Sequence, residues 1–307
     1  MSYSCVAIYL SQNHSKSLNK RISPYKQTFI RLATHYVIEL FFLFRLKFIE
    51  AISFFRFLPF SGEERELELE MGLKVYADRT SQPSRAIIIF CKMNQIDFEE
   101  VKIDLSKGQH RTPEFEKINP MKKVPAIVDG RFKLFESHAI LRYLACSFPS
   151  VSDHWYPNDL TSRAKIDSIL DWHHANLRQG AGTYVFHGAM APAFGLPLNA
   201  QVAEQGKKLM LSSLSKIELF WLRGDSRFLL GNSQPSIADL CLVCELMELE
   251  VVDSEERERI LEPHQKIRDW MENVKRATHP HFLEVHGILY ELKARLESRR
   301  NKVSTNL

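Results

Sequence analysis

Cysteine is scarce in this sequence, with five residues among 307, an odd number at wide spacing. Such a set does not form the paired framework that staples small secreted domains, so we expect reduced thiols and a reducing compartment. Cys241 and Cys244 form a C-x-x-C pair, but they share the apolar face of a predicted helix with Ile237 and Leu240. No second ligand pair stands at zinc spacing. We therefore expect both cysteines in the core and no bound metal.

The sequence also lacks a glycine-rich phosphate loop and a G-x-S-x-G nucleophile motif. Acidic residues are absent from positions 1–38, and residues 1–62 hold 8 Lys+Arg against 2 Glu, a net charge of +6. Since the whole chain carries +4, residues 63–307 carry −2. The main part of the chain is slightly acidic, which argues against nucleic acid as a partner.

The first seventy residues differ in composition from the rest. Residues 1–38 are basic and rich in serine, which is typical of an organellar transit peptide. Residues 36–60 are very apolar, but five charged residues interrupt them, so a membrane-spanning helix is not expected. An interfacial helix, a removable leader and a start of translation at Met71 stay open as explanations. We treat residues 1–70 as an extension without identifiable chemistry.

Residues 72–148 predict alternating strands and helices. The apolar pattern predicts a strand from Leu73, a helix to about Asn94, a strand at 98–105, a short helix at 112–118, strands at 123–130 and 132–135, and a helix at 136–148. This βαβ-α-ββα order is that of an α/β thioredoxin-like domain. In such a domain Pro125 is expected to follow a cis peptide bond, which would turn the Val124 backbone outward to pair with a bound peptide.

The second half of the chain predicts helices throughout. Apolar residues recur at helical spacing in four groups, and Ser236 with Asp239 forms a variant of the capping box. The groups are Ile166, Ile169, Leu170, His173 and Leu177; Ser213, Ile217, Phe220 and Trp221; Ile267, Trp270, Met271 and Val274; and Phe282, Val285, Leu289, Leu292 and Leu296. We expect a thioredoxin-like domain at 71–150, a linker at 151–160, a helical bundle domain at 161–297 and a tail at 298–307.

Ser81 stands where the first strand gives way to the first helix. Pro83 follows two residues later, in the first helical turn that proline favours. The hydroxyl is therefore held at a helix N-terminus, where free N–H groups and the macrodipole favour a negative charge. Helix capping by the same hydroxyl is the alternative interpretation.

Four motifs follow in order, SQPSR (81–85), KGQH (107–110), NPMKKVPAI (119–127) and FESHAILRYL (135–144). Together they resemble the glutathione S-transferases over roughly residues 71–295. A serine at position 81 followed by Gln-Pro resembles the theta class, and DHWYP (153–157) is similar to its plant members. The resemblance implies the cytosolic glutathione transferase fold, a thioredoxin-like domain followed by an all-α domain.

The resemblance implies roles for individual residues. Ser81 would stabilise the glutathione thiolate, with Gln82 beside it, and the Val124-Pro125 backbone would pair with the tripeptide. His110, Arg111 and Lys123 would hold the glycyl carboxylate, Glu136 and Ser137 the γ-glutamyl end, and Arg178 would reach the electrophile. The apolar segment 188–199 either shapes an electrophile pocket beside Ser81 or is a plain loop between helices.

We expect an enzyme that conjugates glutathione to apolar electrophiles, with reduction of organic hydroperoxides as an additional activity. Glutathione is the co-substrate, and no bound cofactor is expected. The alternative is a non-catalytic glutathione or ligand carrier on the same fold, which would not need Ser81. The resemblance also implies a homodimer in the cytosol. The final residues Ser-Thr-Asn-Leu do not match a peroxisomal address.

Overall fold

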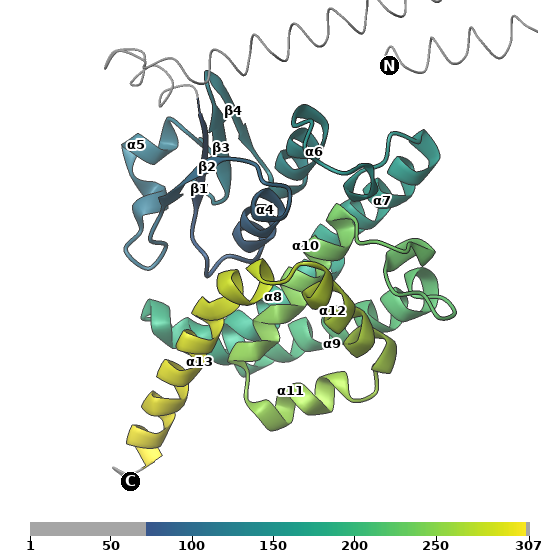
Figure 1. Cartoon of the computed structure of the whole chain (residues 1–307). Helices are drawn as coiled ribbons and strands as arrows, with labels where there is room; N and C mark the ends of the chain where they lie inside the picture. The colour runs from purple at the N-terminus through teal and green to yellow at the C-terminus, as the bar shows by residue number, and fades with distance from the viewer. Residues whose placement is uncertain (1–71, 305–307) are drawn as a thin grey trace, which may run out of the picture. The chain divides into compact units, whose positions relative to one another are not determined.

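A computed structural model describes residues 72–304 (Figure 1). The described residues belong to the second of the two units into which the chain divides, residues 67–307. The expected extension at 1–70 and the last three residues of the expected tail lie outside the described residues. Within 72–304, no helix combines the length and the apolar character needed to cross a membrane.

A four-stranded mixed sheet forms the first half of the described chain. Its strands are β1 (Leu73–Ala77), β2 (Phe98–Lys102), β3 (Ala126–Asp129) and β4 (Phe132–Phe135), in the spatial order β2-β1-β3-β4. β1 pairs with β2 in parallel and with β3 antiparallel, and β3 pairs antiparallel with β4. The helices α4 (Gln82–Met93), α5 (Pro113–Glu116) and α6 (Ser137–Ser147) complete the predicted order. The thioredoxin-like prediction is confirmed.

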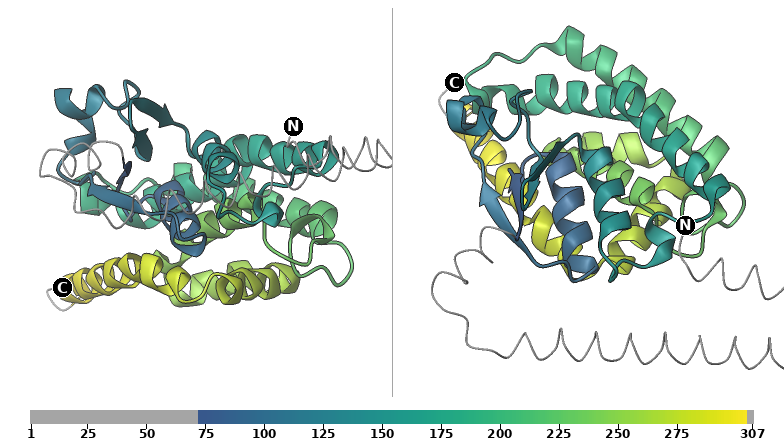
Figure 2. Two further views of the ribbon diagram at one scale, coloured as in Figure 1. Left: turned by 45° about the horizontal axis from the view of Figure 1, so that its top comes forward. Right: turned by 90° about the horizontal axis from the view of Figure 1, so that it is seen from above.

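Local sequence explains these elements. The alternation of buried and half-buried residues along β1 matches a strand with one face in the core. The run Ala86–Cys91 in α4 is buried on all sides, because α4 lies between the sheet and the helices α10 and α13, with α6 beside it (Figures 1 and 2). The second strand is three residues shorter than predicted, since it ends at Lys102, and Leu105 lies in the following turn.

The second half is helical, as predicted. Its α-helices are α7 (Leu160–His173), α8 (Gln179–Val185), α9 (Ala200–Lys216), α10 (Ile237–Leu246), α11 (Ser254–Leu261), α12 (Gln265–Ala277) and α13 (His281–Ser304). Three π-helical segments, η3 (His174–Arg178), η4 (Phe186–Met190) and η6 (Ile217–Trp221), continue α7, α8 and α9. Short 3-10 turns are η1 (Gln109–Arg111), η2 (Asp153–Trp155), η5 (Ala191–Phe194), η7 (Leu229–Gly231) and η8 (Met247–Val251).

Several predicted helix starts are confirmed by their caps. The Thr112 hydroxyl accepts from Phe115 N at 3.3 Å at the start of α5. Asn199 caps α9, and Ser236 and Asp239 form the predicted capping box of α10. Asp239 also accepts from the Trp270 ring at 2.8 Å, so this cap ties α10 to α12. Each cap satisfies backbone N–H groups that a helix start leaves unpaired.

Phe220 does not share the buried face of the apolar group in which its spacing placed it. Its side chain is 52% exposed, although Ser213 and Ile217 of the same apolar group are buried. The π turn η6 explains the difference, since Leu222 N bonds to Ile217 O, five residues back. A wider turn breaks the 3.6-residue spacing, and Phe220 rotates out of the buried face.

Candidate active site

Ser81 is the N-cap of α4, at the end of the connection from β1. Its N–H donates to Asp78 O at 2.9 Å, and its carbonyl accepts from Arg85 N at 3.1 Å. Its hydroxyl makes no capping hydrogen bond. The alternative interpretation, in which the hydroxyl serves to cap the helix, is therefore not supported. The hydroxyl stays available at the positive end of a helix.

Ser81 lines a cavity of about 960 Å³. The sheet half contributes the β1–α4 connection and the loops around 105–111 and 121–124, and the helical half contributes residues of η3, α8 and η4. Phe186, Met190 and Leu196 supply an apolar part of the wall of the same cavity. The predicted segment 188–199 thus reaches the same cavity as Ser81. A concave site with one apolar wall and a few polar groups is typical of a small-molecule pocket.

His110 and Arg111 lie side by side on this cavity. Arg111 Nε donates to His110 Nε2 at 3.3 Å, which places the proton of a neutral imidazole on Nδ1. That nitrogen is buried without a hydrogen-bond partner among the described residues. Burial and the Arg111 charge lower the pKa of His110, with Asp78 acting in the opposite direction. His110 is therefore a neutral donor with a free N–H.

The loop 119–125 brings a cation and a main-chain edge to the cavity. The Asn119 side chain is buried, donates to Lys123 O at 2.7 Å and accepts from Met121 N at 2.9 Å, which fixes the loop. Lys123 is exposed and forms no ion pair within the described part of the chain. The Val124–Pro125 peptide bond is cis, as predicted, and Val124 lines the cavity whereas Pro125 is buried behind it.

Glu136 and Ser137 are not among the residues that line this cavity. Glu136 is exposed and adopts φ 70°, ψ 110° at the start of α6, a conformation that a non-glycine residue rarely takes. Such local strain is found most often at functional positions. The Glu136 carboxylate lies close enough to His174 to act on its pKa, which burial, His173 and Arg178 together lower.

A second cavity of about 280 Å³ adjoins the first. The two share Gln82, Arg178 and Gly182, so the predicted residues Gln82 and Arg178 stand between them. Arg178 Nη1 contacts Glu245 Oε2 at 2.9 Å, and His173 Nε2 lies 3.6 Å from the same oxygen. The structure thus brings together Ser81, Gln82, His110, Arg111, Lys123, Val124 and Arg178, and leaves Pro125, Glu136 and Ser137 outside the wall of the larger cavity.

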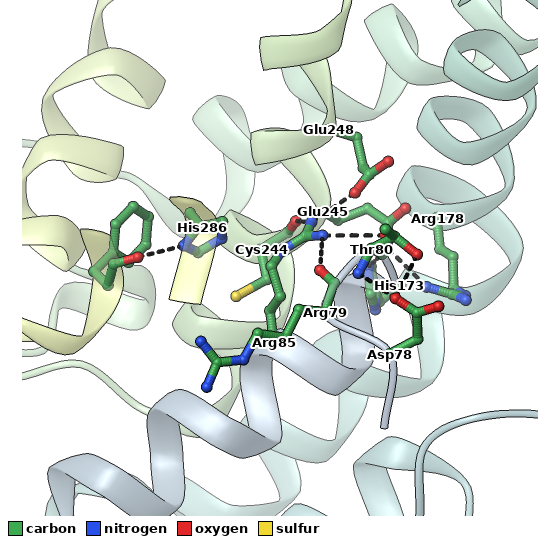
Figure 3. Close-up of polar contacts among 11 residues, drawn as sticks. Asp78, Arg79, Thr80, Arg85, His173, Arg178, Cys244, Glu245, Glu248 and His286 are labelled. Atoms are coloured by element: carbon green, nitrogen blue, oxygen red, sulfur yellow. Dashed lines mark hydrogen bonds and ion pairs between the residues drawn. The ribbon is translucent and has the colours of Figure 1, made fainter. Parts of the chain in front are cut away.

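Three charged residues beside the site were not predicted: Arg85, Glu245 and Glu248 (Figure 3). Arg85 and Glu248 form a buried ion pair with Nη2 2.6 Å from Oε1, and Glu248 lines the cavity. A signal was present in the sequence, because acids at 245 and 248 interrupt an otherwise apolar helical run. Buried acids need cationic partners, but the sequence did not identify which ones.

The arrangement can stabilise a small anion. The Ser81 hydroxyl, which makes no hydrogen bond within the described part of the chain, lies at the start of a 12-residue helix, next to an apolar wall and a cationic loop. A thiolate held there would receive a hydrogen bond and the favourable field of the helix end. The cationic loop would hold a carboxylate of the same molecule, and the apolar wall would hold a second, apolar reactant.

The model of the glutathione S-transferase N-terminal domain matches residues 71–146. The chain is 61% identical to Glutathione S-transferase T1 of Arabidopsis thaliana over 230 residues, which cover 75% of this chain and 94% of that protein. It is 38% identical to Glutathione S-transferase theta-1 of Homo sapiens over 225 residues, covering 73% and 91%.

A solved human theta-class glutathione transferase, in complex with the glutathione conjugate of 1-menaphthyl sulfate, has a TM-score of 0.68 at 33% identity. The similarity covers 75% of this chain and 92% of that structure. The predicted family is thereby confirmed by sequence and by fold. The chain belongs to the glutathione S-transferase family, and within it to the theta class.

Proposed function

We propose that Ser81 stabilises the thiolate of bound glutathione, which then attacks an electrophile seated against Phe186, Met190 and Leu196. The observation that carries this proposal is the Ser81 hydroxyl on the cavity wall at the N-terminus of α4, where it makes no capping hydrogen bond. A thiol with a pKa near 8.5 is mostly protonated at neutral pH. Lowering that pKa by about two units requires roughly 2.7 kcal/mol of preferential stabilisation of the thiolate.

The tripeptide is proposed to lie across the sheet half. Val124 would pair with its main chain, and His110, Arg111 and Lys123 would bind the glycyl carboxylate. The free Nδ1–H of His110 and the unpaired Lys123 support this role. Glu136 and Ser137 would bind the γ-glutamyl end, with Ser137 as the first residue of α6 and its N–H directed at the carboxylate.

The reactant held by the apolar wall decides the outcome. Attack of the sulfur on an electrophilic carbon gives a thioether and releases the leaving group. Attack on a hydroperoxide oxygen releases an alcohol, and a second glutathione then completes the reduction to the disulfide and water. Arg178, half exposed between the two cavities, is placed to contact an anionic part of the electrophile.

The test compares the full-length protein with Ser81→Ala and Ser81→Thr. We expect Ser81→Ala to bind glutathione within about threefold of the parent and to lose roughly 10²-fold in kcat, as loss of one aligned anion donor does. The pKa of the bound thiol, titrated by thiolate absorbance, should return towards its free value. Ser81→Thr should recover part of both losses, and Ser168→Ala, on exposed α7 surface, should change neither.

A normal thiol pKa in the parent enzyme would contradict the proposal. Glutathione binding without any lowering of its thiol pKa would instead support a carrier. Unchanged turnover in Ser81→Ala would assign thiolate stabilisation to another group. Conjugation and cumene hydroperoxide reduction are assayed in parallel, because both depend on the same thiolate.

We also propose that the protein is a cytosolic homodimer. Met121 and Phe132 expose 55% and 45% of their surface on the sheet half, and exposed large apolar side chains of this kind suit a subunit contact. Sedimentation equilibrium should give twice the chain mass, and Phe132→Lys should shift it towards the monomer. A monomer at micromolar concentration would contradict the dimer.

The proposed cytosolic location has its own test. A full-length fluorescent fusion confined to an organelle would contradict the location.

A further inference from the structure

Side chains of residues 78–80, the connection between β1 and α4, bind β2 and the turn that follows it. Arg79 donates to both carboxylate oxygens of Glu100, at 2.9 and 2.7 Å. Asp78 accepts from Thr80 N at 2.8 Å and from Leu105 N at 3.0 Å. These bonds hold the connection against β2 and the following turn, but they do not contact the carbonyl groups that precede Ser81.

A single buried guanidinium fixes the inner side. Arg85 Nη1 donates to Arg79 O at 3.0 Å and to Thr80 O at 3.2 Å, and Nη2 donates to Cys244 O at 3.0 Å (Figure 3). The same Nη2 lies 2.6 Å from Glu248 Oε1. The Arg85 side chain has no exposed surface. The two carbonyls that accept from Nη1 belong to the residues directly before Ser81.

Arginine suits this place for a geometric reason. Its planar guanidinium presents several donors in a rigid fork, so one group can bind two loop carbonyls and two acceptors on the helical half at once. Lysine carries a point charge on a flexible stem and cannot reproduce that fork. Glu248 restricts the rotation of the guanidinium and neutralises a charge that would otherwise be buried alone.

We propose that Arg85 is a positioning residue for Ser81, acting through the carbonyl oxygens of Arg79 and Thr80, and that Glu248 holds Arg85 in the required orientation. The proposal rests on the proposed function, in which the Ser81 hydroxyl stabilises the thiolate. A displaced connection would rotate the hydroxyl away from the sulfur while the loops that bind the rest of glutathione stay in place. The expected signature is lost reactivity with retained binding.

The experiment measures glutathione affinity, kcat and the pKa of the bound thiol in full-length Arg85→Lys. We expect affinity within about threefold of the parent, a kcat about 10- to 100-fold lower, and a thiol pKa raised by about one unit, because small misplacements of a reacting group cost this much. Arg142→Lys is the matched control. Arg142 also binds a carboxylate, Asp167, at 2.7 Å, but it joins α6 to α7 and does not contact residues 78–80.

A double-mutant cycle of Arg85→Lys with Ser81→Ala tests whether Arg85 acts by positioning Ser81 or by stabilising the fold in general. If Arg85 acts through Ser81, the double variant should have the same thiol pKa and kcat as Ser81→Ala alone. Additive losses in the double variant would overturn the proposal, and so would a bound-thiol pKa in Arg85→Lys equal to that of the parent enzyme. If Ser81→Ala itself leaves the thiol pKa unchanged, the proposed function fails first, and the cycle shows which of the two has failed.

A second pair of variants covers the case in which Arg85→Lys does not fold. Glu248→Gln keeps an oxygen acceptor for Arg85, whereas Glu248→Leu removes it. The thiol pKa, measured without an electrophile, should rise in Glu248→Leu, and Glu248→Gln should restore part of the loss. Equal behaviour of the two variants would show that the acceptor does not position Arg85, and would overturn the role of Glu248.

Discussion

Two acidic residues three positions apart each receive an arginine from a distant element, and the two pairs differ in exposure. Glu248 binds Arg85 of α4, whose side chain is fully buried. Glu245 binds Arg178 of η3, whose side chain is 35% exposed. Both acids are themselves buried. The same kind of ion pair therefore buries Arg85 completely but leaves Arg178 with donors that face a cavity.

The pKa values of the two acids shift in opposite directions. Burial raises the pKa of Glu248, with Arg85 acting against it. Burial acts in the same direction on Glu245, but Arg178 and His173 together outweigh it and lower the pKa below its ordinary value. Two side chains, Arg178 and His173, thus face the single carboxylate of Glu245.

The largest expected effect comes from breaking the buried pair. Arg85→Met leaves Glu248 without a partner and should lower the free energy of unfolding by about 3–5 kcal/mol. The measurement is urea denaturation of the full-length protein. Arg85→Met combined with Glu248→Leu should recover most of that loss, since an apolar replacement of both partners removes the buried charge. A double variant as unstable as the single one would contradict this account.

A smaller loss of stability is expected where α8 crosses α9, close to the Arg178–Glu245 pair. A Cβ at Gly180 would lie 2.5 Å from Met210 N, a backbone atom of α9 that cannot easily move. Gly180→Ala should therefore lower the free energy of unfolding by about 1–3 kcal/mol. Because Arg178 is two residues away, turnover with anionic electrophiles should fall while the thiol pKa stays constant.

The matched control for this crossing is Gly287→Ala on α13. Among the described residues, no atom outside the neighbouring backbone of the helix lies within 4 Å of a Cβ there, so alanine should stabilise the helix by roughly 0.5–1 kcal/mol. The measurement is the thermal unfolding midpoint of both variants. If the two substitutions shift the midpoint equally, close contact of the α8 and α9 backbones is not what sets their spacing.

Breaking the half-exposed pair should cost less than breaking the buried one. Arg178→Gln leaves His173 near Glu245 and admits water, so we expect a loss of about 1–2 kcal/mol, reduced from the buried value by solvent screening. Urea denaturation gives the value, with Lys165→Gln on exposed α7 as the neutral control. A loss equal to that of Arg85→Met would remove the distinction between the pairs.

The smallest effect is a difference in pH dependence with opposite signs. The lowered pKa of Glu245 means that its contribution is present above about 4.5 and is lost as the pH falls through the native-state value. The raised pKa of Glu248 means that its contribution is present below about 4.5 and is lost as the pH rises through the native-state value.

Stability curves of Glu245→Gln and Glu248→Gln against the parent protein test these signs. Each difference should change with pH by at most about 1.4 kcal/mol per unit, the limit for one proton. The stability difference between the parent and Glu245→Gln should become smaller as the pH falls. The stability advantage of the parent over Glu248→Gln should become smaller as the pH rises above about 4.5. Equal slopes of one sign would contradict the comparison.

Local patterns predicted most of the elements. Strand alternation at Leu73–Ala77, the Thr112 cap and the Ser236–Asp239 capping box are interactions among residues close in the chain, and the structure confirms each. Burial of Cys241 and Cys244 followed from the apolar run around them and is also confirmed. Phe220 follows the apolar spacing of its helix but is exposed, because a π turn depends on packing that the spacing of apolar residues does not encode.

The sequence by itself determined the order of strands and helices, the position of Ser81 at a helix start, and the family. Those features depend on short-range hydrogen bonds, on turn residues and on motifs contiguous in the chain. Only the tertiary structure decided that the Ser81 hydroxyl does not cap its helix and that Arg85 binds Glu248, 163 residues away. A buried charge can be recognised from sequence, but its partner is chosen by packing of distant elements.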